Sequence, residues 1–154
     1  MVLDWRNRPE VRSVMLTQHE IRLDEHRQWF ENASLDPTRC LLIAEEAGQP
    51  LGYVHFSGVV TRGIASWGFY TAAGAPPESG SRLGRAALDH AFDVRGVHKV
   101  CGQVLATNIA SLRFHRKLGF VEEGVLREQQ QIDDTYYDLI CFGLLRREWR
   151  GLTE

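Results

Sequence analysis

Residues 104–120, VLATNIASLRFHRKLGF, constrain the fold more tightly than any other stretch of this chain. They complete an apolar run that begins at Lys99 and has the character of a strand, and Asn108 is a preferred residue at a helix N-cap. Apolar residues then recur at helical spacing, at Ala110, Phe114 and Leu118, until Gly119 stops the helix. The run predicts a strand that leads into a capped helix, which serves either as an ordinary connection or as a site built on a helix end.

The segments around this unit predict a mixed α/β domain. Helical patterns cover 3–15, with a break at Pro9, 24–32 and 81–94, and strand patterns cover 40–44, 51–56, 65–71, 99–106, 121–131 and 136–145. Asp133 and Asp134, between the last two strands, favour an antiparallel hairpin. No linker or repeat divides the chain, so we expect a single domain over residues 1–154, with helices on both faces of a mixed sheet.

Composition excludes several classes of function. A net charge of −2 with 25% charged residues lacks the basic excess of nucleic-acid binders. The three cysteines, Cys40, Cys101 and Cys141, lie in apolar stretches, which favours reduced and buried thiols. No apolar run reaches the roughly 18 residues that a membrane span needs, and the first residues lack a secretory signal. We therefore expect a cytoplasmic protein without membrane or nucleic-acid partners.

The histidines do not follow a metal-binding pattern. No two of His19, His26 and His55 share a short ligand spacing, and the cysteines are remote from them in sequence. We therefore expect no metal.

A resemblance to a known family appears in the residues that flank the predicted helix cap. Asn108, Ser111, Phe114, Lys117, Gly119 and Phe120 follow the pattern Asn-x-x-Ser-x-x-Phe-x-x-Lys-x-Gly-Phe. This pattern resembles the signature of the GCN5-related N-acetyltransferases (GNAT), which bind acetyl-CoA. The resemblance implies the GNAT fold, a mostly antiparallel sheet with a splayed central pair of parallel strands.

Further segments resemble one branch of that superfamily. They include Arg6-Asn7, 18–21, Trp29-Phe30, 67–70, 122–127 and 141–145. These segments are similar to the PseH-type enzymes, which acetylate the 4-amino group of a UDP-linked aminodideoxy sugar on the route to pseudaminic acid. Relatives begin with a strand and half a helix before the position of Trp5. Either that first strand is missing here, which leaves a sheet edge exposed, or the start codon was assigned too far downstream, and we favour the second.

The resemblance assigns the cofactor to the loop and helix start at 79–84. Exposed amides at a helix N-terminus can hold the diphosphate of CoA. Ser79 and Arg82 depart from the family pattern, which has Arg or Gln and then Gly at these places, and the alternative is a plain loop and cap. Expected cofactor contacts are Phe69, Tyr70, Thr71, Gly80, Ser81, Arg82, Leu83, Gly84, Arg85, Asn108, Ser111, Phe114 and Lys117. Arg82 and Arg85 are expected to supply compensating charge.

Two histidines are the predicted catalytic residues. His115 stands where many relatives carry a Tyr that donates a proton toward the CoA sulfur, and histidine can do the same near neutral pH. His55 is expected to position or deprotonate the amine. A packed structural role is the alternative for each.

The resemblance also assigns the acceptor. Residues expected to face it are Arg6, Asn7, Gln18, His19, Trp29 and Trp67. The leading function is transfer of acetyl from acetyl-CoA to the 4-amino group of a UDP-linked sugar by direct attack in a ternary complex. Buried cysteines disfavour an acyl-cysteine route. The alternatives are a protein N-terminal acetyltransferase of the ribosomal-protein type and a non-catalytic acyl-CoA-binding module. The sequence leaves open whether the chain forms a homodimer.

Overall fold

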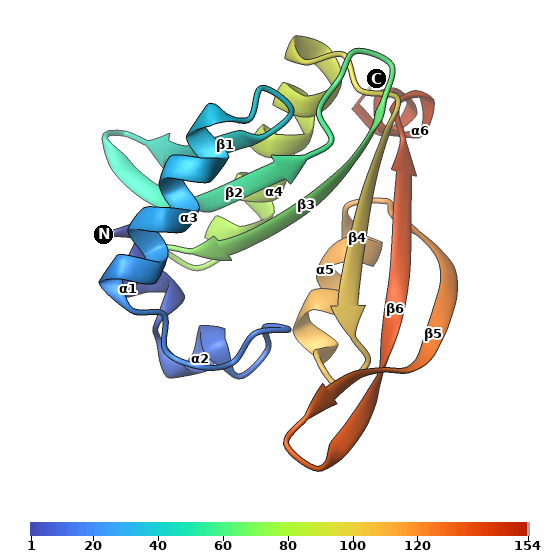
Figure 1. The fold of residues 1–154 in the computed structure, drawn as a ribbon. Helices are drawn as coiled ribbons and strands as arrows, with labels where there is room; N and C mark the ends of the chain where they lie inside the picture. Colours follow the sequence, from blue (N-terminus) through green and yellow to red (C-terminus); the bar gives the residue numbers. More distant parts are fainter. Residues whose placement is uncertain (154) are drawn as a thin grey trace.

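The computed structural model describes residues 1–153 (Figure 1). The helices are α1 Val2–Arg6, α2 Pro9–Arg12, α3 Leu23–Leu35, α4 Ser79–Asp89, α5 Ile109–Lys117 and α6 Arg146–Thr153. The strands are β1 Cys40–Glu46, β2 Gln49–Ser57, β3 Ile64–Thr71, β4 Lys99–Leu105, β5 Val121–Ile132 and β6 Thr135–Leu145.

All six described strands form one sheet, in the order β1-β2-β3-β4-β6-β5. β3 and β4 run parallel, and every other neighbouring pair among these strands is antiparallel. A parallel pair needs a crossover connection, which the α4 segment supplies between β3 and β4. The predicted mixed sheet with one central parallel pair is therefore confirmed.

Helices cover the two faces of the sheet unequally. α4 lies behind β1, β2 and β3, and α5 lies behind β4, whereas α1 and α3 lie in front of the β1–β3 half (Figure 1). β5 is exposed along nearly its whole length. None of the described helices covers the front of β4 (Figure 1), and Gln103 on this strand is exposed.

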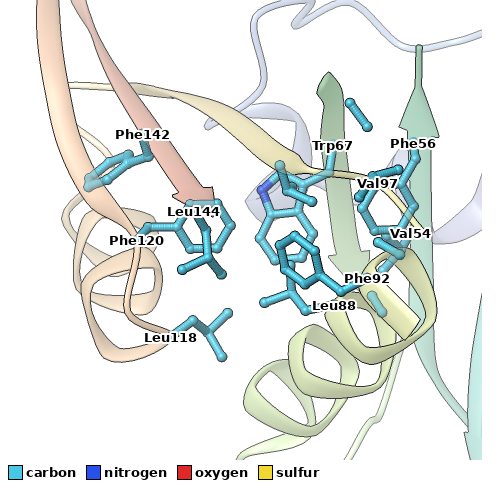
Figure 2. Close-up of a cluster of buried hydrophobic side chains, with 14 of the residues drawn as sticks. Val54, Phe56, Trp67, Leu88, Phe92, Val97, Leu118, Phe120, Phe142 and Leu144 are labelled. Atoms are coloured by element: carbon cyan, nitrogen blue, oxygen red, sulfur yellow. The ribbon is translucent and has the colours of Figure 1, made fainter. Parts of the chain in front are cut away.

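The main core lies between the back of the sheet, α4 and the C-terminal end of α5 (Figure 2). Leu88, Phe92 and Leu144 are fully buried there, and each such side chain contributes roughly 1.5–3 kcal/mol. Gly84 allows α4 to approach α5 closely, because a Cβ at Gly84 would lie 2.7 Å from Cζ of Phe114. This packing holds the N-terminus of α4 and the start of α5 beside the same strands.

The helix predicted over 81–94 begins two residues earlier than expected and reaches Val94 as predicted, although its last turn has π-helical geometry. α4 begins at Ser79, because Glu78 adopts a left-handed conformation (φ +66°) that turns the chain into the helix two residues early. After Asp89 the helix continues as one π-helical turn, His90–Val94.

The C-terminal helix and the N-terminal edge of the sheet both bear on the sequence predictions. The sequence did not predict α6, which is held by Trp149: its indole N–H donates to Asp89 Oδ1 at 2.8 Å and its ring stacks on Phe92. In the described residues no strand precedes β1, which forms one edge of the sheet.

Candidate active site

The central parallel strands separate part of the way along. β3 and β4 are paired only at Ile64–Lys99, Ala65–Val100 and Ser66–Cys101. From Trp67 and Gly102 onward the two strands diverge, as Figure 1 shows. Backbone groups on the facing edges therefore lack strand partners, and such groups require hydrogen bonds from another source. The predicted splay is confirmed.

Two cavities meet at this splay. The first, which we call the α4–α5 cavity, has a volume of about 420 Å³ and extends from the diverging strands to Gly80, Asn108 and Ser111. The second, the α1–α3 cavity, has a volume of about 680 Å³ and lies on the front face, where Arg6 and Trp29 line it. Residues of both strands line both cavities, namely Trp67, Gly68, Tyr70, Gly102 and Gln103. Both volumes are in the range of small-molecule sites.

The N-terminus of α4 offers fewer free amides than the sequence predicts. The amides of Ser81 and Arg82 both donate to the carbonyl of Glu78, at 3.1 and 3.3 Å, and the amide of Ser79 donates to Pro76. The amide of Gly80 has no hydrogen-bond partner within residues 1–153, and Gly80 lines the α4–α5 cavity. The helix dipole still places partial positive charge at this end of the cavity.

The predicted cap of α5 is present. Asn108 Oδ1 accepts a hydrogen bond from the amide of Ser111 at 3.2 Å. This bond fixes the first turn of the helix against the end of β4, and both residues line the α4–α5 cavity. Phe114, one turn further along, forms the wall together with Phe69, and their ring centroids lie 4.7 Å apart.

His115 is a buried histidine with both nitrogens engaged. It is 2% exposed, its Nδ1 lies 2.8 Å from the carbonyl oxygen of Ser111, and its Nε2 accepts a hydrogen bond of 3.2 Å from the indole of Trp67. These partners fit the neutral tautomer with the proton on Nδ1. Burial lowers the pKa of His115. To act as the predicted acid, His115 would need a proton on Nε2, but Nε2 already accepts the hydrogen bond from the Trp67 indole.

His55 lies on the opposite face of the sheet and lines the α1–α3 cavity. It pairs in register with Gly68, and its imidazole covers that glycine so closely that a Cβ there would lie 2.8 Å from Nε2. Nδ1 is buried without a partner, and Nε2 forms no hydrogen bond within the described chain. Burial is the main cause that lowers the pKa of His55, so the ring is neutral near pH 7.

Arg6 and two tyrosines complete the polar lining of the α1–α3 cavity. Arg6 Nη2 donates to the carbonyl of Thr17 at 2.7 Å, whereas its Nη1 is buried without a partner. Burial raises the pKa of Tyr70 to about 12, so its hydroxyl stays protonated. Tyr53, whose ring centroid is 5.1 Å from that of Tyr70, also lines the cavity.

The structure brings most of the predicted site residues together. On the α4–α5 side these are Phe69, Tyr70, Thr71, Gly80, Asn108, Ser111, Phe114 and His115. On the α1–α3 side these are Arg6, Trp29, His55 and Trp67.

Several predicted cofactor residues lie elsewhere. Leu83 and Gly84 are buried in the core, because α4 packs this side against β2 and against Phe114 of α5. Arg82 pairs with Glu46 Oε2 at 2.5 Å on the surface, and Arg85 is exposed outside the cavity. Ser81 and Lys117 contact each other at 3.5 Å beside the cavity without lining it.

Three predicted acceptor residues also lie outside the α1–α3 cavity. Asn7 exchanges two hydrogen bonds of 2.8 Å with the backbone of Ile21, which satisfies its amide. Gln18 donates to the carbonyl of Ser13, and His19 pairs with Glu25 at the surface. These side chains belong to the loop between α2 and α3, and four other residues of that loop line the cavity, namely Met15, Leu16, Thr17 and Ile21.

Sequence reasoning missed several lining residues. Met15 and Leu16 line both cavities, and Tyr53 and Glu25 line the α1–α3 cavity. A signal for Tyr53 was present, because it lies two residues before His55 on a strand and therefore on the same face. Cys101 lines this cavity too, and both Cys101 and Cys141 are half-buried rather than buried as predicted, whereas Cys40 is buried. Burial raises the pKa of the Cys101 thiol, which makes the thiolate scarce.

Two kinds of feature are absent from the described residues. No group of three or more His, Cys, Asp or Glu side chains is arranged to hold a metal ion. Across residues 1–153, none of the helices has both the length and the apolar character required to traverse a bilayer.

Comparison with curated proteins gives partial matches. An N-acetyltransferase of the SPbeta prophage of Bacillus subtilis, YokL, is 47% identical over 51 residues, which cover 33% of this chain and 29% of that protein. The putative ribosomal N-acetyltransferase YdaF of the same organism is 30% identical over 67 residues, which cover 44% of this chain and 37% of that protein. Spermidine N(1)-acetyltransferase of Vibrio cholerae is 30% identical over 84 residues, which cover 52% of this chain and 49% of that protein. The chain thus matches less than half the length of each.

Solved structures agree over nearly the whole chain. Spermidine N-acetyltransferase from Vibrio cholerae, in complex with CoA and spermine, has a TM-score of 0.83 at 22% identity and covers 97% of this chain and 90% of that one. Ribosomal-protein-alanine N-acetyltransferase from Brucella melitensis has a TM-score of 0.77 at 25% identity, with 93% and 91% covered. The likeness to the Vibrio cholerae structure, at 22% identity, shows that the two chains share a fold.

The family itself is shown by its sequence model. The model described as Acetyltransferase (GNAT) domain matches residues 1–121. The expected enzyme class, an N-acetyltransferase that uses acetyl-CoA, is confirmed at the level of the family. The PseH-type branch is not distinguished by these comparisons. With the splayed strands and the capped helix α5 in the expected places, the chain belongs to the acetyltransferase (GNAT) domain family.

Proposed function

We propose that this chain transfers acetyl from acetyl-CoA, bound in the α4–α5 cavity, to an amine bound in the α1–α3 cavity. The observation that carries the proposal is that the same residues, at the splay of β3 and β4, line both cavities. A thioester that enters from one side and an amine that enters from the other meet there. Direct transfer needs both substrates held together, and positioning supplies much of the rate.

On the cofactor side, the unpaired edge of β3 receives the pantetheine arm as an added strand. The arm would run from Trp67 toward Thr71, and the diphosphate would lie at the N-terminus of α4. With the amides of Ser81 and Arg82 already paired, Gly80 supplies the direct hydrogen bond. The remaining attraction comes from the helix dipole.

In the reaction, the neutral amine attacks the thioester carbonyl carbon. The tetrahedral intermediate collapses, the C–S bond breaks and CoA leaves as a thiolate. The proton lost by nitrogen goes to His55 Nε2, directly or through one water, and the thiolate takes a proton from solvent. His55 suits this role because its ring is neutral and its Nε2 has no partner within the described chain. His115 is assigned a positioning role, because it anchors the Trp67 indole.

We propose a UDP-linked 4-amino sugar as the acceptor. Aromatic side chains, among them Trp29 and Tyr70, line the α1–α3 cavity and can stack on a base or cover a sugar face. Arg6 adds a charged donor for a phosphate or carboxylate oxygen. A polyamine fits less well, because Glu25 is the single carboxylate among the described lining residues and Arg6 offsets its charge. The PseH-type resemblance points to the same acceptor.

A protein N-terminus is the second candidate acceptor. The match to a putative ribosomal N-acetyltransferase and the fold shared with a ribosomal-protein-alanine N-acetyltransferase favour it. A peptide would need to lie along the open front of β4, next to the α1–α3 cavity. Gln103 is exposed there.

The test combines binding with turnover. Calorimetry measures the Kd of acetyl-CoA, and a thiol-release assay compares a UDP-linked 4-amino sugar, an alanine-terminated peptide and spermidine. We expect turnover of the amino sugar above both others. Turnover of the peptide alone would replace the acceptor, and tight acetyl-CoA binding with no turnover would favour a non-catalytic acyl-CoA-binding module.

A pair of variants at Gly80 tests the cofactor site. Gly80→Pro removes the free amide, whereas Gly80→Ala keeps it, and a Cβ at this position has its nearest neighbours at an ordinary 3.9 Å. Loss of one hydrogen bond to a charged group should raise the Kd of acetyl-CoA about tenfold in Gly80→Pro. Gly80→Ala should match the unmodified protein. Equal Kd values in a folded Gly80→Pro variant would contradict the assignment.

A further inference from the structure

Three buried polar atoms without partners surround the α1–α3 cavity. They are Arg6 Nη1, Tyr53 Oη and His55 Nδ1, and all three residues line it. Buried polar groups in folded proteins are nearly always hydrogen-bonded, and exceptions gather where a ligand completes the pairing. Their convergence on one cavity indicates a ligand that carries several hydrogen-bonding atoms.

Tyr53 is the most constrained of the three. The residue is only 4% exposed. Its ring is held between Trp29, at a centroid distance of 6.3 Å, and Tyr70, at 5.1 Å. A phenylalanine would fill this space equally well, so packing alone does not explain the hydroxyl. Its hydroxyl is buried and has no hydrogen-bond partner within the described chain, although the residue lines the cavity.

The register of β2 against β3 gives the position of this hydroxyl relative to the reaction. His55 is opposite Gly68 at the splay, and Tyr53 is opposite Tyr70. Two residues of strand separate His55 from Tyr53, which is about 7 Å along β2. When the amine lies beside His55, a group that contacts Tyr53 is about one sugar ring away.

We propose that Tyr53 determines acceptor specificity by hydrogen-bonding an oxygen substituent of a ring-shaped acceptor, one ring's width from the reacting amine. The inference rests on the proposed function, because it requires the acceptor in the α1–α3 cavity. A hydroxylated or acylated sugar satisfies both Tyr53 and Arg6. A polyamine brings a second cation beside Arg6 instead. A site built to pair with an oxygen discriminates strongly against a ligand that lacks it.

Tyr53→Phe is the direct test. We expect KM for the UDP-linked 4-amino sugar to rise about fivefold, with kcat and the Kd of acetyl-CoA unchanged. The melting temperature should stay equal or rise, because the variant removes an unpaired buried hydroxyl. Tyr136→Phe, on the exposed tip of the β5–β6 hairpin, is the matched control and should alter none of these quantities. A clear fall in the melting temperature of Tyr53→Phe would show an internal partner and overturn the inference.

A second set of acceptors identifies the oxygen. UDP-linked 4-amino sugars that each lack one hydroxyl or acetamido oxygen are compared with the unmodified protein and with Tyr53→Phe. Compared with the complete sugar, one analogue should show a kcat/KM about fivefold lower with the unmodified protein. With Tyr53→Phe the same analogue and the complete sugar should give equal kcat/KM. Equal losses for both proteins with every analogue would overturn the inference.

The acceptor panel separates this inference from the proposed function. If no UDP-sugar is acetylated but a simple amino sugar such as glucosamine is, with the same loss in Tyr53→Phe, the proposed acceptor fails and the role of Tyr53 stands. If UDP-sugars are acetylated and Tyr53→Phe is indistinguishable from the unmodified protein, the function stands and the role of Tyr53 fails. Absence of turnover with every oxygen-bearing amine would overturn both.

Discussion

Two substitutions of His115 should show whether this histidine positions Trp67 or donates a proton. His115→Phe removes the acceptor of the Trp67 indole N–H, a bond of 3.2 Å in a site that is 2% exposed. An unpaired buried donor costs about 2 kcal/mol, which in a domain of this size lowers the melting temperature by about 4–8 °C. His115→Gln retains a side-chain oxygen that can accept from Trp67, so we expect it to recover most of this loss.

Turnover distinguishes the two roles. A positioning residue predicts that kcat of folded His115→Gln stays within about threefold, since proton transfer does not pass through it. A general acid predicts a loss of about 10²–10⁴ in both variants. Scanning calorimetry and the thiol-release assay measure the two quantities on the same samples. A kcat reduced a hundredfold in a His115→Gln protein of normal melting temperature would refute the positioning role.

The pH dependence of stability gives an independent check. Burial lowers the pKa of His115 in the folded protein below its ordinary value near 6.5. The unfolded chain therefore binds this proton more readily, so the contribution to the free energy of unfolding is complete above about pH 6.5. This stabilising contribution of His115 is lost as the pH falls from about 6.5 toward the lower pKa of the folded protein. Urea unfolding at pH 7.5 and 5.5 should show a smaller difference for His115→Gln than for the unmodified protein.

Three further predictions follow from single contacts. Asn108→Ala removes the side-chain cap of α5 and should lower the free energy of unfolding by about 1 kcal/mol, measured by urea titration. Gly84→Ala should destabilise the fold by about 1–3 kcal/mol, because its Cβ would lie 2.7 Å from Phe114, whereas Gly80→Ala should not, because its Cβ would have its nearest neighbours at an ordinary 3.9 Å. Arg82→Ala should leave the Kd of acetyl-CoA within twofold by calorimetry, because this side chain pairs at the surface outside the cavity; a tenfold weakening would restore its predicted role.

Local patterns predicted the elements that depend on local interactions. The Asn108 cap is one side chain bonding to an amide three residues away, and the sequence contains everything this bond needs. The strands at Cys40 and Lys99 begin where their apolar runs begin. The α6 helix was missed because it depends on Trp149, whose partners Asp89 and Phe92 lie some 60 residues earlier in the chain.

Site residues were predictable in position but not in orientation. The family pattern located the stretch 80–85 correctly at the start of a helix, yet only Gly80 of that stretch lines the cavity. The left-handed Glu78 starts the helix two residues early, but the direction of each helical side chain is set by how α4 packs against the sheet and α5, which local spacing does not reveal. Leu83 thereby became part of the core. Tyr53 was missed because its importance depends on the register of β2 against β3.

The two glycines at the splay explain why the two histidines have different chemistry. Gly68 accommodates the His55 ring on the front face, and Gly102 accommodates the bond between Trp67 and His115 on the back. Neither nitrogen of the His55 ring has a partner in the described chain, whereas both nitrogens of the His115 ring are engaged. A thiolate whose acid has a pKa near 8.5 leaves readily, but an alkylammonium with a pKa near 10 must first lose a proton. A base on the acceptor side therefore serves this reaction better than an acid behind the sheet.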